Sequence, residues 1–96
     1  MYARVATATL KPGTSDPAGK KWTEYMEMFK DKGLHGGYLV VDSSSWKMIS
    51  ITIWETREAE DNYATSPEQT KGRAAMSQFF AEPLSVSRYE VIAKVG

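Results

Sequence analysis

The middle of the chain has the pattern of a β-hairpin. Two runs rich in large apolar residues, 38–42 and 47–55, flank a serine turn at 43–45. Such runs around a short polar turn are typical of paired antiparallel strands. The second run ends in Trp54 and Glu55 and passes directly into a stretch with helical character. The pattern therefore predicts a hairpin that carries a large aromatic side chain to a strand–helix junction, where it could form the wall of a site for an aromatic ligand.

The chain before the hairpin is predicted to form a strand and then a helix. Residues 2–10 are rich in Val, Thr and Ala, as strands are. Asp16 and Pro17 mark a helix start, with Asp16 as the N-cap and Pro17 at the first helical position. Gly33 is expected to end this helix. Its apolar positions recur at i, i+3, i+4 and i+7 and form one stripe: Trp22, Tyr25, Met26 and Phe29.

After the hairpin, the pattern predicts an interrupted helix and a final strand. Thr56 is expected to cap the first helical segment, and the Ser-Pro pair at 66–67 is expected to break the helix and restart it. The second segment, 68–80, carries its apolar residues on one side. Pro83 should end that segment, and residues 85–95 are expected to form the last strand.

The element order is β-α-β-β-α-β over a single domain, residues 1–96. With right-handed crossovers, this order gives a ferredoxin-like α+β fold, in which an antiparallel sheet carries its helices on one face. In the third strand Ile49, Ile51 and Ile53 point to one face, whereas Trp54 points to the other. Both faces therefore carry bulky apolar side chains, although the helices can cover only one. A second copy of the chain is the expected cover, which predicts a homodimer.

The composition excludes several classes of function. Twelve basic and twelve acidic residues give a net charge of +0, and no basic patch points to nucleic acid. The chain has no cysteine, which excludes disulfides and thiolate metal sites and makes a reducing cytoplasm the expected location. No apolar run approaches the ~20 residues of a membrane span. One histidine and scattered carboxylates make no metal-ligand set, and no glycine pattern fits a nucleotide.

Three residues are candidates for catalytic roles. His35 is the only histidine, it lies in the glycine-containing connection before the hairpin, and imidazole is the commonest general base in proteins. A surface position is the plainer interpretation of a single loop histidine. Tyr63 lies on the helix that follows the hairpin, and Arg88 lies in the middle of the last strand. An arginine inside an apolar sheet needs a ligand anion or a carboxylate partner such as Glu90 or Glu55.

Large apolar side chains are the candidates for the lining of a ligand pocket between helices and sheet: Trp22, Met26, Phe29, Trp54 and Phe79. At helical spacing, such residues are more commonly plain core. The two interpretations overlap, because a pocket between a helix and a sheet uses core positions. The indole N–H of a buried tryptophan needs a hydrogen-bond partner, which a ligand oxygen could supply.

Three segments of the chain carry a family resemblance. They are the Gly-Gly-Tyr segment 36–38 that opens the hairpin, the isoleucine-rich strand that ends at residues 54–55, and the helix start Thr-Arg-Glu-Ala at 56–59. Together with the element order, they resemble the antibiotic biosynthesis monooxygenase-like families of the dimeric α+β barrel superfamily, over nearly the whole chain. The resemblance implies a homodimer whose sheets form a shared barrel. It also implies a pocket between helices and sheet in each subunit.

The haem-degrading branch of the same superfamily is disfavoured. By resemblance, its members have a tryptophan where this chain has Trp54, an asparagine on the first strand, and a haem-ligating histidine on the helix after the tryptophan. The first strand here has Thr7 and Thr9 but no asparagine, and the helix has Asn62 and Tyr63 but no histidine. Haem is therefore not expected, and with no cysteine pair, histidine cluster or dinucleotide loop in the sequence no other cofactor is expected.

Three classes of function stay open. The leading hypothesis, which the resemblance implies, is a cofactor-independent monooxygenase of a small aromatic or quinone-like compound. Such an enzyme needs a dry aromatic slot, a base, and a cation near the developing oxyanion. The second class is a non-catalytic small-molecule-binding or stress-related barrel protein that uses the same pocket. The third is a structural dimerisation module with a filled interior. Oxygen uptake separates the first class from the others, and ligand-induced quenching of tryptophan fluorescence separates the second from the third.

Overall fold

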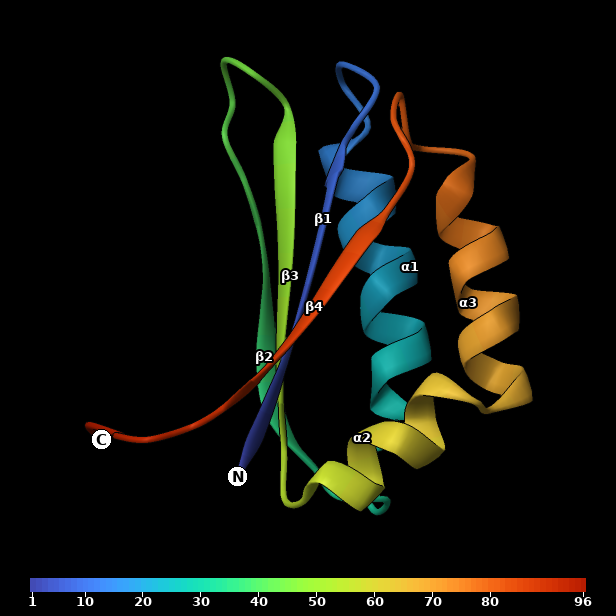
Figure 1. Ribbon diagram of the computed structural model, residues 1–96. Helices are drawn as coiled ribbons and strands as arrows, with labels where there is room; N and C mark the ends of the chain where they lie inside the picture. Colours follow the sequence, from blue (N-terminus) through green and yellow to red (C-terminus); the bar gives the residue numbers. More distant parts are fainter.

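A computed structural model describes residues 1–96 of the chain. The strands and helices follow one another in the predicted order, and the second helical region is divided into two helices (Figure 1). The strands are β1 (Tyr2–Thr9), β2 (Leu34–Val41), β3 (Lys47–Trp54) and β4 (Ser85–Glu90). The helices are α1 (Ser15–Glu27), α2 (Arg57–Ala64) and α3 (Pro67–Ser77).

The strands form one antiparallel sheet in the order β2-β3-β1-β4. One crossover runs through α1 and the other through α2 and α3, and both place their helices on the same face of the sheet (Figure 1). This arrangement confirms the ferredoxin-like α+β fold predicted from the element order. The central strands β1 and β3 pair along their whole length, from Tyr2 opposite Trp54 to Thr9 opposite Lys47.

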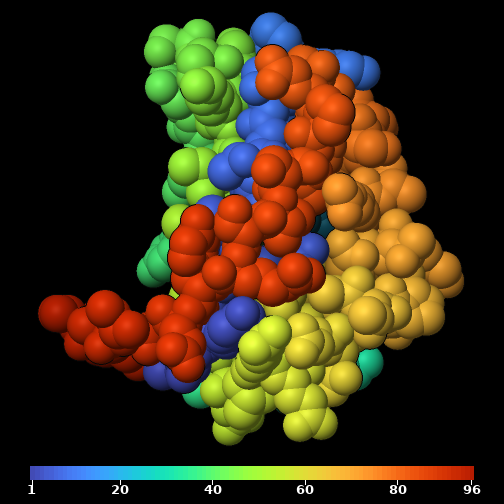
Figure 2. Space-filling view, viewed as in Figure 1, coloured from blue at the N-terminus to red at the C-terminus, as the bar shows by residue number.

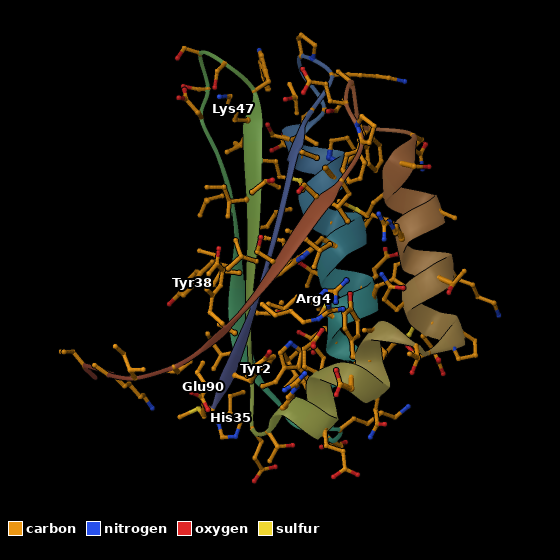
Figure 3. The ribbon with its side chains drawn as sticks, in the orientation of Figure 1. Tyr2, Arg4, His35, Tyr38, Lys47 and Glu90 are labelled. Atoms are coloured by element: carbon orange, nitrogen blue, oxygen red, sulfur yellow. The ribbon has the colours of Figure 1, made fainter.

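Alternate residues of β3 face the helices and the open side of the sheet. Met48, Thr52 and Trp54 are buried beneath the helices, whereas Ile49 is 37% exposed on the open face. Tyr38 of β2 also points away from the helices, and it is 73% exposed (Figure 3). The hydrophobic pattern therefore predicted correctly which residues lie on each face, and the open face keeps an apolar surface with no cover in a single chain.

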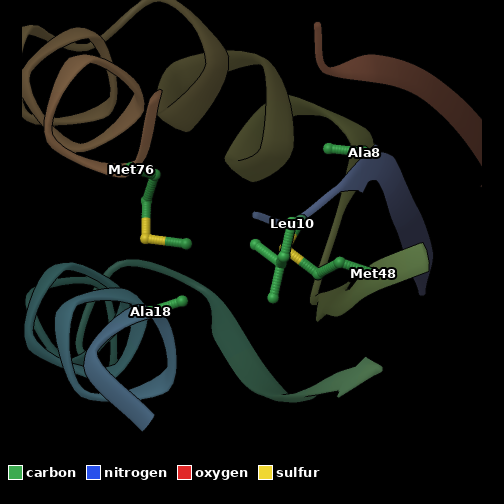
Figure 4. Close-up of a cluster of buried hydrophobic side chains, with 5 residues drawn as sticks. All are labelled: Ala8, Leu10, Ala18, Met48 and Met76. Atoms are coloured by element: carbon green, nitrogen blue, oxygen red, sulfur yellow. The ribbon is translucent and has the colours of Figure 1, made fainter. Parts of the chain in front are cut away.

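The helices and the sheet enclose a hydrophobic core in two parts. The first cluster joins β1, β3, α1 and α3 (Figure 4): Ala8, Leu10, Ala18, Met48 and Met76. The second cluster contains Met26, Phe29 and Trp54. The apolar stripe predicted for the first helix supplies Met26 and Phe29 to this second cluster, and its other members, Trp22 and Tyr25, are half-buried.

Both ends of α1 differ from the prediction. The helix ends at Glu27, and the residues from there to Gly33 form turns. Thr14, not Asp16, occupies the N-cap position, because the first helical hydrogen bond runs from the Ala18 N–H to the Thr14 carbonyl at 3.0 Å. Pro17 therefore lies within the first turn, where backbone N–H groups have no helical partner and a missing N–H costs little. Asp16 also lies in the first turn, where its charge suits the positive end of the helix dipole.

The predicted cap at Thr56 and the predicted helix break at residues 66–67 are both confirmed. The Thr56 hydroxyl accepts a hydrogen bond from the Ala59 N–H at 3.0 Å and caps α2. The Ser66 hydroxyl accepts from the Gln69 N–H at 3.1 Å and caps α3, with Pro67 at the first helical position. The Ser-Pro pair therefore ends one helix and starts the next, as expected from the sequence.

Two strand boundaries differ from the prediction. β2 begins at Leu34 and has an irregular register between Leu34 and Gly36, so His35 lies in a bulged strand and not in a flexible connection. The last strand ends at Glu90 and not at residue 95, because Glu90 already pairs with Tyr2, the first residue of its only neighbour. Beyond it the chain leaves the body of the molecule (Figure 2).

The C-terminal residues 91–96 expose apolar side chains. The Val91 N–H still donates to the Met1 carbonyl at 3.0 Å, but the Ile92 side chain is 95% exposed and Val95 is also fully exposed. These residues therefore add to the uncovered apolar surface at this end of the sheet. None of the three helices is long and apolar enough to cross a lipid bilayer.

The contact between α1 and α3 depends on a glycine, and this generates the first prediction. A Cβ atom at Gly72 would lie 3.0 Å from the ring of Tyr25, whereas one at Gly19 would meet nothing within 4 Å. We expect Gly72→Val to lower the free energy of unfolding by about 1–3 kcal/mol through overpacking. The matched change Gly19→Val should be neutral or slightly stabilising, because glycine is the poorer helix former. Urea denaturation of both variants checks this, and equal stability of the two would contradict it.

Candidate functional site

A cavity of about 70 Å³ lies between the helices and the sheet. Its apolar lining comes from both long helices, the turn after α1, the two central strands and the segment after α3: Ala6, Trp22, Tyr25, Met26, Phe29, Met48, Gly72, Met76, Phe80 and Leu84. Its polar lining comes from the same strands and from α2 and α3: Arg4, Ser50, Thr52, Tyr63, Glu68, Gln69 and Arg73. The cavity is therefore an apolar slot with polar groups of both charges at its border.

The pocket residues predicted from the sequence divide into two groups. Trp22 and Met26 line the cavity from the inner face of α1, and Phe29 lines it from the turn after that helix. Phe79 packs against the first core cluster, and Trp54 is wholly buried in the second; neither borders the cavity. The predicted wall is therefore formed by α1 and the turn that follows it, with Trp54 packed against Phe29 behind this wall, whereas Phe79 belongs to the other part of the core.

Trp54 packs against two aromatic residues that border the cavity, Tyr63 and Phe29. Its ring stacks on that of Tyr63 with centroids 4.8 Å apart and planes inclined by 30°. Phe29 meets the Tyr63 ring edge-on at 4.8 Å and that of Trp54 at 6.0 Å. The indole N–H of Trp54 donates to the Thr52 hydroxyl at 2.9 Å, so this donor already has a partner in the protein. Trp54 therefore fixes the orientation of Tyr63 and Phe29, which do border the cavity.

A buried carboxylate binds two arginines beside the cavity. Glu60 of α2 is 0% exposed, and one carboxylate oxygen accepts from Arg4 Nη1 at 2.7 Å. The other oxygen accepts from Arg88 Nε at 2.8 Å. Arg4 comes from β1 and points toward the helices (Figure 3), and Arg88 comes from the neighbouring β4. The carboxylate partner of Arg88 is thus Glu60, and not Glu90 or Glu55 as the sequence suggested.

Arg4, Glu60 and Arg88 together carry a net positive charge. Of the three, Arg4 borders the cavity. The Arg4 guanidinium lies 5.2 Å from the centre of the Tyr63 ring, within the range of a cation–π contact. Burial raises the pKa of the Tyr63 phenol, and the charge of Glu60 raises it further, although Arg4 and Arg73 oppose this. Tyr63 therefore stays protonated at neutral pH, so it can donate a hydrogen bond to an anion but does not serve as a base.

His35 does not join this group. Its side chain is exposed and lies toward one end of the sheet (Figure 3), where it borders two shallow surface depressions and not the cavity. Of the three catalytic candidates, the structure therefore brings together Tyr63 and Arg88, through Glu60 and Arg4, and leaves His35 apart. No three His, Asp or Glu side chains come close enough together to hold a metal ion.

Several site residues were not found from the sequence: Arg4, Ser50, Glu60, Glu68, Gln69 and Arg73. A signal for Arg4 was present, because it alternates in phase with Ala6 and Ala8 on the inner face of β1. The polar residues of α2 and α3 gave no such signal, since charged residues on short helices are usually solvated. Only the packing of α2 against the sheet shows that Glu60 points inward.

Comparison with known proteins identifies the fold. No protein-family model matches the sequence, and no curated protein matches it. Rv0793 from Mycobacterium tuberculosis has 14% identity and a TM-score of 0.78, with 99% of this chain and 98% of that chain covered. A protein from Deinococcus radiodurans described as a putative antibiotic biosynthesis monooxygenase has 13% identity and a TM-score of 0.80, with 100% and 97% covered. One of the same description from Bordetella bronchiseptica has 19% identity and a TM-score of 0.78, with 96% and 97% covered.

These similarities cover nearly the whole chain in each case. They confirm the predicted resemblance to antibiotic biosynthesis monooxygenase-like proteins at the level of the fold. The activity must be argued from the cavity itself, because a fold supports many functions.

The ion group generates the second prediction. Glu60→Gln removes the charge that two arginines share, so we expect it to lower the free energy of unfolding by about 3 kcal/mol, the lower end for breaking a buried pair. The lower end applies because the Arg88 side chain is 43% exposed and can turn to water. The matched change Glu24→Gln breaks only an exposed pair with Lys21 and should cost at most about 1 kcal/mol. Urea denaturation at neutral pH compares the two, and equal costs would refute a stabilising role for Glu60.

Proposed function

We propose that this chain is a small cofactor-independent monooxygenase that oxidises a one-ring phenol or quinol between its helices and its sheet. The observation that carries the proposal is the composition of the cavity. Its walls are mainly aromatic rings and methionine side chains, which suit a flat apolar ring. The same cavity is bordered by the phenol of Tyr63 and the guanidinium groups of Arg4 and Arg73, which suit a developing negative charge.

In the proposed reaction the substrate supplies its own electrons. An electron-rich phenol or a quinol that loses its proton becomes a phenolate, and such a phenolate can give electrons to O₂. One oxygen atom enters the ring to give a quinone, and the other leaves as water. The protein has to accept the phenolic proton, hold the oxyanion and exclude bulk water.

Each of these tasks has a candidate at the cavity. Glu68 borders the cavity, and its carboxylate makes no ion pair, so it is the proposed proton acceptor. Tyr63 would donate a hydrogen bond to the oxyanion, and Arg4 and Arg73 would supply positive charge. Arg88 would act as a positioning residue, because it reaches the site through Glu60. His35 has no role in this proposal, because it lies outside the cavity.

The size of the cavity limits the substrate. A dry cavity of about 150 Å³ in another protein binds benzene, and the present cavity of about 70 Å³ is smaller. Met26, Met48 and Met76 line it, and unbranched thioether side chains shift easily to admit a ligand. A single ring could therefore enter with modest side-chain movement, whereas a three-ring anthrone would require the helices to separate.

The alternative function is a binding protein without catalysis. The observation that favours it is the state of the buried carboxylate, since both oxygens of Glu60 are occupied by arginines and neither is free to take a proton. If Glu68 does not act as the base, the same cavity could bind a small aromatic compound and leave it unchanged.

The open face of the sheet supports a homodimer as part of the proposal. Tyr38, Val40, Ile49 and Tyr89 are all exposed large apolar side chains, and the exposed C-terminal residues 91–96 lie beside this face. A single-chain protein rarely keeps such a surface uncovered. A second copy packed through this face would bury it and would leave the cavity, which lies on the helix side, open in each subunit.

The third prediction tests the activity. We expect oxygen uptake by the wild-type protein with an electron-rich phenol or with hydroquinone, without added cofactor and above the rate without protein. Glu68→Gln should lower turnover by about 10²–10⁴-fold, as expected for loss of a general base. Tyr63→Phe should lower it by roughly 10²-fold, as expected for loss of one oxyanion donor. An oxygen electrode measures both.

The control for this prediction is Glu58→Gln, a matched change on the exposed surface of α2 that should keep wild-type turnover. Wild-type turnover in Glu68→Gln would reject the assigned base. Absence of oxygen uptake over a panel of phenols and quinols would reject the monooxygenase in favour of the binding protein.

The fourth prediction concerns assembly. The wild-type protein should sediment as a dimer at micromolar concentration, because an obligate interface of this kind buries about 2,000 Å² or more. Ile51→Asp introduces a charge on the open face of a central strand and should give a monomer. Thr70→Asp on the exposed side of α3 should leave the dimer intact. Analytical ultracentrifugation measures all three, and a monomeric wild-type protein would refute the proposed dimer.

A further inference from the structure

Gln69 occupies a core position on α3. It is 9% exposed, and the other buried residues of this helix, Gly72 and Met76, follow it at i+3 and i+7. That spacing forms the inner stripe of a helix, where apolar residues are expected. All three residues line the cavity. A polar amide therefore lies on the face of α3 that covers the sheet.

The side-chain amide of Gln69 has no partner within the protein. No hydrogen bond of this side chain is formed, and the Ser66 hydroxyl accepts from the backbone N–H of Gln69 at 3.1 Å, not from its amide. No fully enclosed side-chain nitrogen or oxygen lacks a hydrogen bond in this structure, so the amide must border accessible space, and the cavity is the space that Gln69 lines. An amide that borders this space without a protein partner gives the folded chain no hydrogen bond, whereas a leucine or methionine of similar volume would add apolar packing at the same position. The amide is therefore suited to a partner that enters the cavity.

Ser50 of β3 offers a second unused group in the same cavity. Its oxygen accepts a hydrogen bond from the indole N–H of Trp22 at 3.0 Å. Its own hydroxyl hydrogen has no acceptor in the protein, because no other hydrogen bond of this side chain is formed. A serine hydroxyl in this state still has one donor to offer. The free donor of Ser50 and the amide of Gln69 together favour an oxygen atom as the group to be bound.

We propose that Gln69 determines the specificity of the cavity by hydrogen bonding to the oxygen of a one-ring phenol or quinone, with the Ser50 hydroxyl as a second donor. The amide NH₂ suits a carbonyl or phenolate oxygen, and the amide oxygen suits a phenolic O–H. The apolar walls contribute affinity for any flat ring, so they do not distinguish an oxygenated ring from a hydrocarbon. This inference rests on the proposed function only in that the cavity receives a small aromatic molecule.

The fifth prediction compares two probes that differ by one oxygen atom. p-Cresol and toluene have nearly the same size, and the methyl group of p-cresol blocks the ring position at which oxygen would enter to form a p-quinone. Titrations under anaerobic conditions follow tryptophan fluorescence and the NMR signal of the Trp22 indole N–H. We expect the wild-type protein to bind p-cresol more tightly than toluene. Gln69→Leu should lower its affinity for p-cresol roughly tenfold, as expected for one lost hydrogen bond, and leave its affinity for toluene unchanged or higher.

Two further variants control for structural effects. Gln69→Met tests the same loss with an unbranched side chain, in case leucine perturbs the packing of α3. Gln78→Leu removes an exposed amide that donates to the Ala75 carbonyl at 2.8 Å, and it should change neither affinity. The melting temperature of both Gln69 variants should stay at or above that of the wild type, because the removed amide has no partner in the protein.

Three outcomes would overturn the inference. The first is equal affinity of the wild type and both Gln69 variants for p-cresol. The second is a wild-type protein that binds neither probe, which would mean that the cavity holds only water. The third is a fall in melting temperature with unchanged p-cresol affinity, which would give Gln69 a structural role. These titrations require no turnover, so Gln69-dependent binding without oxygen uptake would keep this inference and reject the monooxygenase.

Discussion

The buried carboxylate of Glu60 is the interaction on which the arrangement of this site depends. It joins α2 to β1 through Arg4 and to β4 through Arg88, so one side chain fixes three elements at the same end of the sheet. A carboxylate that is 0% exposed is tolerated only because both of its oxygens accept charge-assisted hydrogen bonds. The same contacts hold the Arg4 guanidinium over the ring of Tyr63, and thereby fix the polar end of the cavity.

The remainder of the cavity combines rigid and adaptable parts. The rings of Tyr63 and Phe29 form a fixed wall with Trp54 packed behind them, because each of the three rings restricts the others. The methionines on the other walls have flexible side chains and can change the volume of the slot. Fixed polar groups beside adjustable apolar walls suit a ligand site of a particular kind. The polar groups can bind an oxygen atom at a defined position, and the apolar walls can adapt to rings of different shape.

The two faces of the sheet divide the tasks of the molecule. The face under the helices holds the core and the cavity, and the opposite face presents Tyr38, Val40 and Ile49 to solvent. The division follows from the period-two alternation of strands, which places the side chains of Met48 and Ile49 on opposite sides of one backbone. Burial of the open face by a partner would therefore leave the groups that border the cavity unaffected.

The sequence by itself determined the element order, the faces of the hairpin, the cap at Thr56, the helix break at residues 66–67 and the aromatic stripe that begins in α1, because each depends on local chemistry and a fixed period. The ends of strands and helices depend on their neighbours as well as on the local sequence. The last strand, for example, ends at Glu90 because the strand beside it begins at Tyr2. Only the tertiary structure decided which polar residues meet. Glu60 and Arg4 are 56 residues apart in the chain, and no local pattern relates residues at that separation. For the same reason the structure moved His35 out of the site and brought Gln69 into it.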